Sequence, residues 1–234
     1  MPPNRHARAL QGIASDVAAC ERCPRLREYC TEVARVRRAA YRDETYWGRP
    51  VPGFGDSEAW LLIVGLAPGA HGSNRTGRMF TGDRSGEWLY GELFRQRLAS
   101  RPDALRAGDG LTLDGVYITA AGRCAPPGNK PEPAELDRCR EYLVREMRAL
   151  PKLHVRLALG KIGFEAIVKA RRALGQPDLD PRPVFAHGAR VALPEGGWLL
   201  ASYHPSQQNT STGKLTAAMW RGIFETAIGL RDRV

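Results

Sequence analysis

Several features that mark common protein classes are absent from this sequence of 234 residues. It has no run of about 18 apolar residues, so we expect no membrane-spanning segment. Its first residues lack the apolar core of a secretory signal peptide. Neither G-x-G-x-x-G nor G-x-x-x-x-G-K-[ST] occurs, which argues against a common nucleotide-binding loop.

Acidic residues are also in short supply. The chain has 25 Asp and Glu against 35 Lys and Arg, which gives a net charge of +10. Such a balance favours a polyanionic partner, most often nucleic acid. A basic chain that is simply rich in arginine is the alternative. We therefore expect a monomeric, cytoplasmic, nucleoid-associated protein with no membrane partner.

The chain has only five cysteines, which in a reducing compartment should be free or metal-bound rather than disulfide-bonded. Cys20 and Cys23 form a C-x-x-C pair, which can bind one metal centre from a single turn. The pair alone would also suit a zinc half-site or a redox dithiol. Cys124 in a loop and Cys139 in a helix can complete a four-thiolate site, so the pattern favours a cluster.

The most informative stretch runs from Gly65 to Asp83 and follows an apolar run, Trp60–Val64, that is typical of a buried strand. Five glycines and a proline predict a tight loop that approaches a ligand closely. Its polar and aromatic side chains are His71, Asn74, Arg75, Arg78, Phe80 and Asp83. This set indicates a site for a flat, polar, partly anionic ligand, with a generic phosphate loop as the alternative.

Apolar runs alternate with helical patterns along the rest of the chain. Strands are expected at 60–64, 115–119, 155–159 and 198–202. Helices are expected at 8–19, at 87–98 and at 215–230, with one more that starts at 133 and another that ends near 174. This order predicts a three-layer α/β/α sandwich with a central, mostly parallel four-stranded sheet. Residues 175–197 are a connection that could form an edge hairpin. We expect one domain over 1–234, in which residues 1–56 supply helices and a loop with two of the cysteines.

Loops that begin at Gly65, Ala120 and Tyr203 leave the carboxyl ends of three expected strands, where ligands bind in such sheets. The first loop, with its Gly-Leu-Ala-Pro-Gly-Ala-His-Gly, Asn-Arg-Thr-Gly and Phe-Thr-Gly-Asp segments, resembles the first motif of family 5 (type b) uracil-DNA glycosylases. The segment from Tyr203 to Asn209, Tyr-His-Pro-Ser-Gln-Gln-Asn, resembles their second active-site motif. The resemblance extends from about Cys20 to the last helix.

This resemblance implies a glycosylase that removes uracil from DNA and a structural [4Fe–4S] cluster on Cys20, Cys23, Cys124 and Cys139. Two positions depart from the wider superfamily. Leu66 stands where many relatives have an acidic or amide residue, and Ala120 stands where many have an asparagine that reads uracil. Family 5 shares both departures, which imply a broader range of deaminated bases, including hypoxanthine.

Breaking an N-glycosidic bond needs an anion facing the sugar and hydrogen-bond donors facing the departing base. Asp83 is the candidate anion, and His204 is the candidate donor to a base oxygen. Asp83 could instead cap the helix that follows it, and His204 could be a core histidine. His71 could line the same pocket.

The remaining expected site residues fall into two groups. Base-binding positions are Gly65, Leu66, Ala67, Phe80 and Ala120, with Phe80 as the stacking face. Positions that bind DNA phosphates or fill the gap in the stack are Asn74, Arg75, Ser206, Gln207, Gln208 and Asn209. Arg35, Arg37, Arg38 and Arg42 are interpreted as a solvated helix face. Two rival functions stay open: a non-enzymatic iron–sulfur module that binds nucleic acid, and a hydrolase of free nucleotides.

Overall fold

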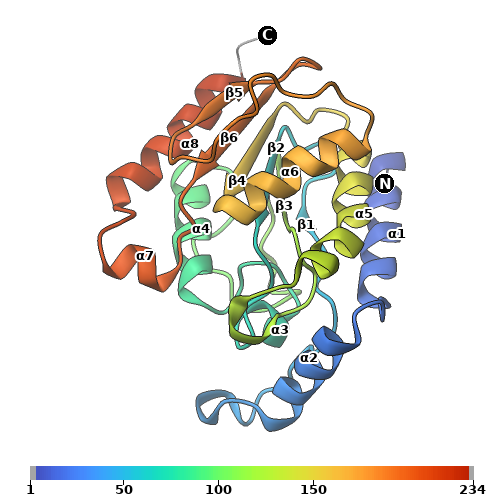
Figure 1. Cartoon of the computed structure of the whole chain (residues 1–234). Helices are drawn as coiled ribbons and strands as arrows, with labels where there is room; N and C mark the ends of the chain where they lie inside the picture. The colour runs from blue at the N-terminus through green and yellow to red at the C-terminus, as the bar shows by residue number, and fades with distance from the viewer. Residues whose placement is uncertain (1–3, 232–234) are drawn as a thin grey trace.

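A single six-stranded sheet organises the computed structural model, which describes residues 4–231 (Figure 1). The strand order is β1-β3-β2-β4-β6-β5. The strands are β1 (Phe54–Gly55), β2 (Leu61–Gly65), β3 (Val116–Ala120), β4 (Val155–Leu159), β5 (Arg190–Ala192) and β6 (Trp198–Ser202). The helices are α1 (Arg5–Ala18), α2 (Pro24–Val36), η1 (Ala39–Tyr41), α3 (Ser73–Thr76), α4 (Arg84–Arg95), η2 (Pro127–Asn129), α5 (Pro133–Ala149), α6 (Lys161–Ala173), α7 (Gln207–Ser211) and α8 (Ala217–Arg231).

The four central strands, β3, β2, β4 and β6, are parallel, as the sequence predicts. Two short antiparallel strands extend the sheet at its edges, β1 beside β3 and β5 beside β6. β5 lies in the segment where an edge hairpin was expected. β1 was not expected, because two residues are too few to show a strand periodicity.

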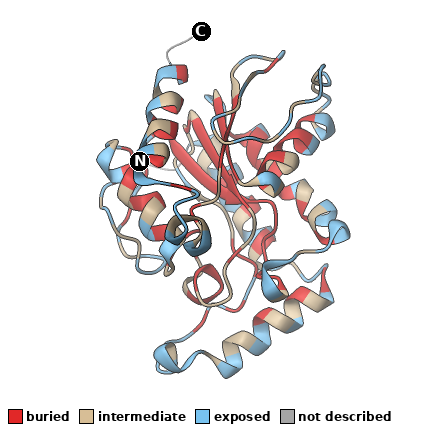
Figure 2. Cartoon of the chain, turned by 60° about the vertical axis from the view of Figure 1, so that its left-hand side comes forward, coloured by how far each residue is buried: buried red, intermediate tan, exposed pale blue. Residues whose placement is uncertain are grey.

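Helices cover both faces of the sheet and make it a three-layer sandwich. Every residue of β2, β3 and β4 is buried, which explains their continuous apolar runs. Along β2, Leu61 and Ile63 pack with α4 and α8 on one face, whereas Leu62 and Val64 pack with α1, α5 and α6 on the other. Figure 2 shows these buried strands at the centre of the molecule. No helix within residues 4–231 is long and apolar enough to cross a bilayer.

Two helices begin earlier than the hydrophobic pattern predicts, because side-chain caps set their first turns. The Asn4 side chain accepts a hydrogen bond from the Ala7 N–H, and α1 begins at Arg5. The Asp83 side chain accepts one from the Gly86 N–H, and α4 begins at Arg84. Asp83 therefore ends the loop after β2 and starts a helix at the same time.

The segment formed by α2 and η1 extends from the body of the molecule, at the bottom of Figure 1. Within α2 only Leu26 and Cys30 are buried, and Figure 2 draws this lowest helix with mostly intermediate and exposed residues. A bidentate ion pair holds it to α5: Arg25 Nε and Nη2 lie 2.8 and 2.7 Å from the two oxygens of Glu135. Because Glu135 is buried, this pair fixes the start of α2 against the sandwich.

A buried ion pair joins the loop after β3 to α5. Arg123 Nη2 lies 2.6 Å from Glu146 Oε2, and both side chains are almost completely shielded from solvent. Thr119 in β3 donates to the same carboxylate at 2.8 Å, and the Arg123 carbonyl accepts from the Val51 N–H at 2.7 Å. These bonds hold the loop that carries Cys124 against the helix that carries Cys139.

Candidate active site

A cavity of about 870 Å³ opens at the carboxyl ends of the parallel strands. Its walls come from the loops after β2 and β6, the first turns of α4 and α7, and the short helices η1 and η2. Two of the three loops that the sequence predicts to converge therefore meet here. The third, after β3, contributes through Pro126, Gly128 and Asn129 rather than through its first residues.

Asp83 lies in the wall with its carboxylate in a space that glycines leave open. Its Oδ1 accepts the Gly86 N–H at 3.0 Å. Its Oδ2 faces Gly69 and Gly72, where an added Cβ would lie 3.0 and 2.3 Å from that oxygen. Burial raises the pKa of Asp83, and the N–H groups of Gly86 and Ser85 oppose this rise. One oxygen thus caps the helix while the other stays available to the cavity.

His204 and Phe80 form a stacked pair across the two main loops. Their ring centroids are 5.8 Å apart with an interplanar angle of 24°. Burial lowers the pKa of His204 to about 4, so the imidazole is neutral at neutral pH. The Asn209 side chain donates to the His204 carbonyl at 2.9 Å and holds the start of this loop. A neutral imidazole can still donate one N–H to a ligand oxygen.

Phe80 depends on Gly65, which was expected to contact the base. A Cβ on Gly65 would lie 2.6 Å from the Phe80 Cζ, so the glycine leaves room for the ring. Phe80 itself has φ +54°, which is unusual for a residue with a side chain. Gly65 is thus the support beneath the ring and lies outside the cavity wall, which does include Leu66 and Ala67.

Ala120, another expected base-binding position, also lies outside the cavity wall. It is 1% exposed and packs in the core with residues of α4 and α8. The backbone beyond β3 stays paired with the end of β2 and the residue after it: the Ala121 N–H donates to the Gly65 carbonyl and the Gly122 N–H to the Leu66 carbonyl. Ala120 therefore shapes the support of the site rather than its surface.

Asn74 and Arg75 do not lie where phosphate contacts were expected. Asn74 is fully buried, and its Nδ2 lies 3.4 Å from the Cys30 carbonyl. Arg75 pairs with Glu44, donates to the Gly82 carbonyl and lies over the Tyr41 ring at 3.9 Å. Asn74 Nδ2 and the Arg75 guanidinium thus bond inside the protein, so both residues brace the loop. Arg78 of the same loop is also engaged, with Asp109.

The second motif provides the opposite wall. Ser206 caps α7 by accepting the Asn209 N–H at 3.3 Å, and it lines the cavity with Gln207 and Gln208. Both glutamines are exposed, so they are accessible to a ligand at the mouth of the cavity. Asn209 is absent from the wall and supports the His204 backbone instead.

The four predicted cluster cysteines come together where α1, α2, α5 and the loop after β3 meet. Burial raises the pKa of the Cys139 thiol, and the nearby Cys23 and Cys20 thiols raise it further. Cys124 lies close enough to Cys139 to interact with it electrostatically. Among residues 4–231, no three His, Cys, Asp or Glu side chains could hold a single metal ion.

An iron–sulfur cluster makes a different demand, because each of its four thiolates binds a separate iron atom. The surroundings suit such anionic ligands: Arg138 Nε lies 3.3 Å from Cys23 Sγ, and the charges of Arg27 and Arg123 act on Cys124 and Cys139. The donor set and the nearby cations therefore fit the predicted group. Cys30, the fifth cysteine, is buried beside Cys124, and its Sγ lies 3.5 Å from the Ala125 carbonyl.

Comparison with known proteins agrees with these features. Residues 52–227 match the family described as the Uracil DNA glycosylase superfamily. A type-5 uracil-DNA glycosylase of Thermus thermophilus is 51% identical over 219 residues, which cover 93% of this chain and 96% of that protein. The chain belongs to the type-5 family of this superfamily.

Two proteins of one organism, Pyrobaculum aerophilum, allow a comparison of the type-5 and type-4 families. The type-5 enzyme is 44% identical over 208 residues, with 89% of this chain and 87% of that protein covered. The type-4 enzyme is 29% identical over 200 residues, with 84% and 83% covered. The higher identity to the type-5 enzyme confirms the family that the sequence motifs indicate.

Several residues of this type-5 site were not expected from the sequence. Tyr29 comes from α2, Tyr41 comes from η1, and Arg38 is the residue before η1. Arg84 and Glu87 come from α4. They lie outside the recognisable motifs, and only the fold brings them to the cavity. Of the four arginines interpreted as a solvated face, Arg38 alone lines the cavity.

The low pKa of His204 can be measured directly. In an NMR titration the His204 ring should change protonation near pH 4 rather than near its usual 6.5, because burial disfavours the charged form. Since the folded pKa lies below the unfolded one, the stability that neutral His204 contributes is complete above 6.5 and is lost as the pH falls towards 4. The His204→Gln variant assigns the signal by its disappearance, and a midpoint near 6.5 would contradict the buried environment.

Proposed function

We propose that this protein hydrolyses the N-glycosidic bond between uracil and deoxyribose in DNA and leaves an abasic site, the first step of base excision repair. It would act as a monomer on nucleoid DNA in the cytoplasm. The proposal rests on one observation: the Asp83 carboxylate and the neutral His204 imidazole line the same cavity. The names of the type-5 relatives support the same activity.

The chemistry follows from where charge develops in the transition state. As the bond to the base breaks, the sugar gains positive charge and the base gains negative charge. Asp83 would stabilise the sugar cation or orient the attacking water, whose oxygen forms the new bond to the sugar carbon. His204 would donate a hydrogen bond to a base oxygen, and Phe80 would stack on the extruded base. One proton of the water ends on the released base, and the other stays on the new hydroxyl group of the sugar.

The same cavity suits other deaminated bases. Leu66 and Ala67 line it without any side-chain polar atom, and Ala120 does not reach it. A wall of this kind discriminates weakly between related ligands, because no buried polar group is left unpaired by the wrong one. We therefore propose that hypoxanthine is a substrate as well as uracil.

Duplexes with one labelled uracil or hypoxanthine test both parts of the proposal. After incubation, alkali cleaves the strand at each abasic site, so both duplexes should give the short labelled product. A rival binding module would bind the duplexes and cleave neither. A hydrolase of free nucleotides would act on deoxyuridine monophosphate instead. Cleavage of the uracil duplex but not of the hypoxanthine duplex would contradict the proposed range of substrates.

Asp83 can be tested with a pair of variants that separates charge from helix capping. Asp83→Asn keeps a good N-cap but removes the anion, whereas Asp83→Ala removes both. Both should lower the single-turnover rate by about two to four orders of magnitude. Only Asp83→Ala should lose about 1 kcal/mol of stability. Because burial raises the pKa of Asp83, the rate of the wild type should fall on the acid side at a pH above the ordinary Asp range.

Asn4→Ala is the matched control, because Asn4 caps α1 far from the cavity. It should cost a similar amount of stability and leave the rate intact. A wild-type rate for Asp83→Asn would show that the carboxylate serves only as a cap.

We further propose that Cys20, Cys23, Cys124 and Cys139 hold a structural [4Fe–4S] cluster. When bound, the cluster would join α1, α2 and α5 to the loop after β3 and take no part in hydrolysis. Purified protein should be brown, with about four irons per chain, since each of four thiolates binds one iron. Cys139→Ser should lose the colour and part of its thermal stability. Colourless, folded protein with one zinc per chain would overturn this proposal.

A further inference from the structure

Two arginines at the mouth of the cavity make no polar side-chain contact with the rest of residues 4–231. Arg38 precedes η1 and Arg84 is the first residue of α4, and both line the cavity with exposed side chains. Within residues 4–231, neither guanidinium has an ion-pair, hydrogen-bond or aromatic partner. The arginines of the same two segments differ, because Arg35 pairs with Glu32 and Arg95 with Glu92.

The position of Arg84 is unfavourable for the helix itself. A cation in the first turn opposes the positive end of the helix dipole, where acidic residues are preferred. Arg84 is also not the counter-ion of its neighbour, because the charges that act most on Asp83 are those of Glu87 and Arg75. An anion at the mouth of the cavity would give this arginine the partner that the protein does not supply.

Arg38 is held in place by its backbone while its side chain stays free. α2 ends at Val36, and the next residue, Arg37, has φ +59°. Arg37 Nη1 donates to the Arg42 carbonyl at 2.7 Å. The Arg38 N–H donates to Tyr46 Oη, which in turn lies 3.1 Å from His71 Nδ1. Burial lowers the pKa of His71 in the cavity wall, and the positive charge of Arg38 lowers it further. The Arg38 backbone is therefore fixed, and its unpartnered guanidinium lies at the cavity wall.

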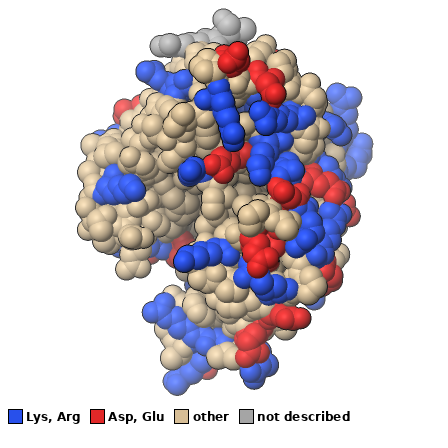
Figure 3. Space-filling model, in the orientation of Figure 1, with Lys and Arg blue, Asp and Glu red and all other residues tan. Residues whose placement is uncertain are grey.

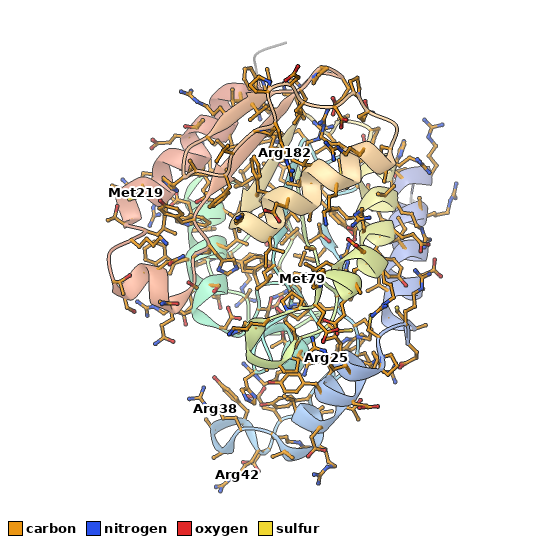
Figure 4. The ribbon with its side chains drawn as sticks, in the orientation of Figure 1. Arg25, Arg38, Arg42, Met79, Arg182 and Met219 are labelled. Carbon is orange, nitrogen blue, oxygen red and sulfur yellow. The ribbon has the colours of Figure 1, made fainter. Side chains whose placement is uncertain are left out.

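Figure 3 shows Lys and Arg side chains at the lower tip of the molecule, over α2 and η1. Figure 4 places Arg38 and Arg42 on this segment, below the end of the sheet where the cavity opens. Arg42 lies 3.8 Å from Asp43 and is absent from the cavity wall. Of Arg38 and Arg42, only Arg38 lines the cavity.

We propose that Arg38 and Arg84 bind two phosphates of the damaged strand, on either side of the nucleotide that enters the cavity. This inference rests on the proposed function. A nucleotide turned out of the helix keeps both of its phosphates at the mouth of the pocket. Arginine matches a phosphate with two parallel hydrogen bonds, and each contact releases counterions from the DNA. Two cations from separate walls would hold the strand in register.

The probe is a duplex that contains one tetrahydrofuran abasic-site analogue, which the enzyme cannot cleave. Binding is measured by fluorescence anisotropy over a range of salt concentrations for the wild type, Arg38→Gln, Arg84→Gln and the double variant. Each lost phosphate contact should reduce the slope of log affinity against log salt by about 0.9. At 0.1 M salt this corresponds to about eightfold weaker binding for each substitution. In the double variant the reduction of the slope should be about twice that of either single variant.

Two kinds of control make the result specific. Arg35→Gln removes an exposed charge from α2, and Arg221→Gln removes one from α8, outside the cavity wall. Both controls should keep the wild-type slope. Arg38→Lys and Arg84→Lys keep the charge and should also keep most of the slope. An unchanged slope in Arg38→Gln and Arg84→Gln, or an equal loss in the controls, would overturn the inference.

The same proteins separate this inference from the proposed reaction. If the wild type cleaves a uracil duplex while the slopes of the variants do not change, the phosphate contacts are wrong and the reaction stands. If the slopes change as expected but the wild type does not cleave uracil, the contacts stand and the reaction is wrong. Thermal midpoints should stay at the wild-type value for the Arg38 and Arg84 variants, since neither guanidinium has a partner within residues 4–231.

Discussion

The site depends on keeping one carboxylate charged in a place with little water. Asp83 achieves this with short-range dipoles: the N–H groups of Gly86 and Ser85 at the start of α4 partly offset the burial that raises its pKa. Glycines make the arrangement possible, because a Cβ on Gly72 would lie 2.3 Å from the carboxylate and one on Gly86 would lie 1.8 Å from the Phe80 carbonyl. Helix capping and catalysis are therefore compatible roles for this residue, since each uses a different oxygen.

The second requirement is that two loops far apart in the sequence keep a fixed relation. Phe80 and His204 meet this requirement by stacking, and the positive φ of Phe80 shows that its backbone adopts a costly conformation to do so. The surrounding structure supplies the compensating energy, because Gly65 beneath the ring and Asn209 behind His204 both favour this geometry. The His204 and Phe80 rings are thus held against each other by the protein itself.

The sequence predicts the parallel strands well, because each is a short apolar run that leads into a polar loop. It also leads to Asp83 and His204, which both line the cavity, because each lies in a contiguous motif. It does not separate surface from support within a motif: Gly65, Ala120 and Asn209 lie behind the cavity, and Asn74 and Arg75 are occupied by internal partners. Periodicity carries no information about which side of a glycine-rich loop faces outwards. The sequence does not predict that Arg38 lines the cavity, because only the turn at Arg37 brings it there.

These internal contacts also connect the cysteines to a cavity whose wall they do not form. Asn74 of the cavity loop lies against the carbonyl of Cys30 in α2, and the Arg75 carbonyl accepts the Trp47 N–H from the segment after η1. α2 is in turn joined to α5 by Arg25 and Glu135, and to the cysteine region by Cys23 at its cap. The segment that presents Arg38 is little buried, so it depends on these few connections. A metal centre on the cysteines would act at their common point and would set the position of one wall of the cavity.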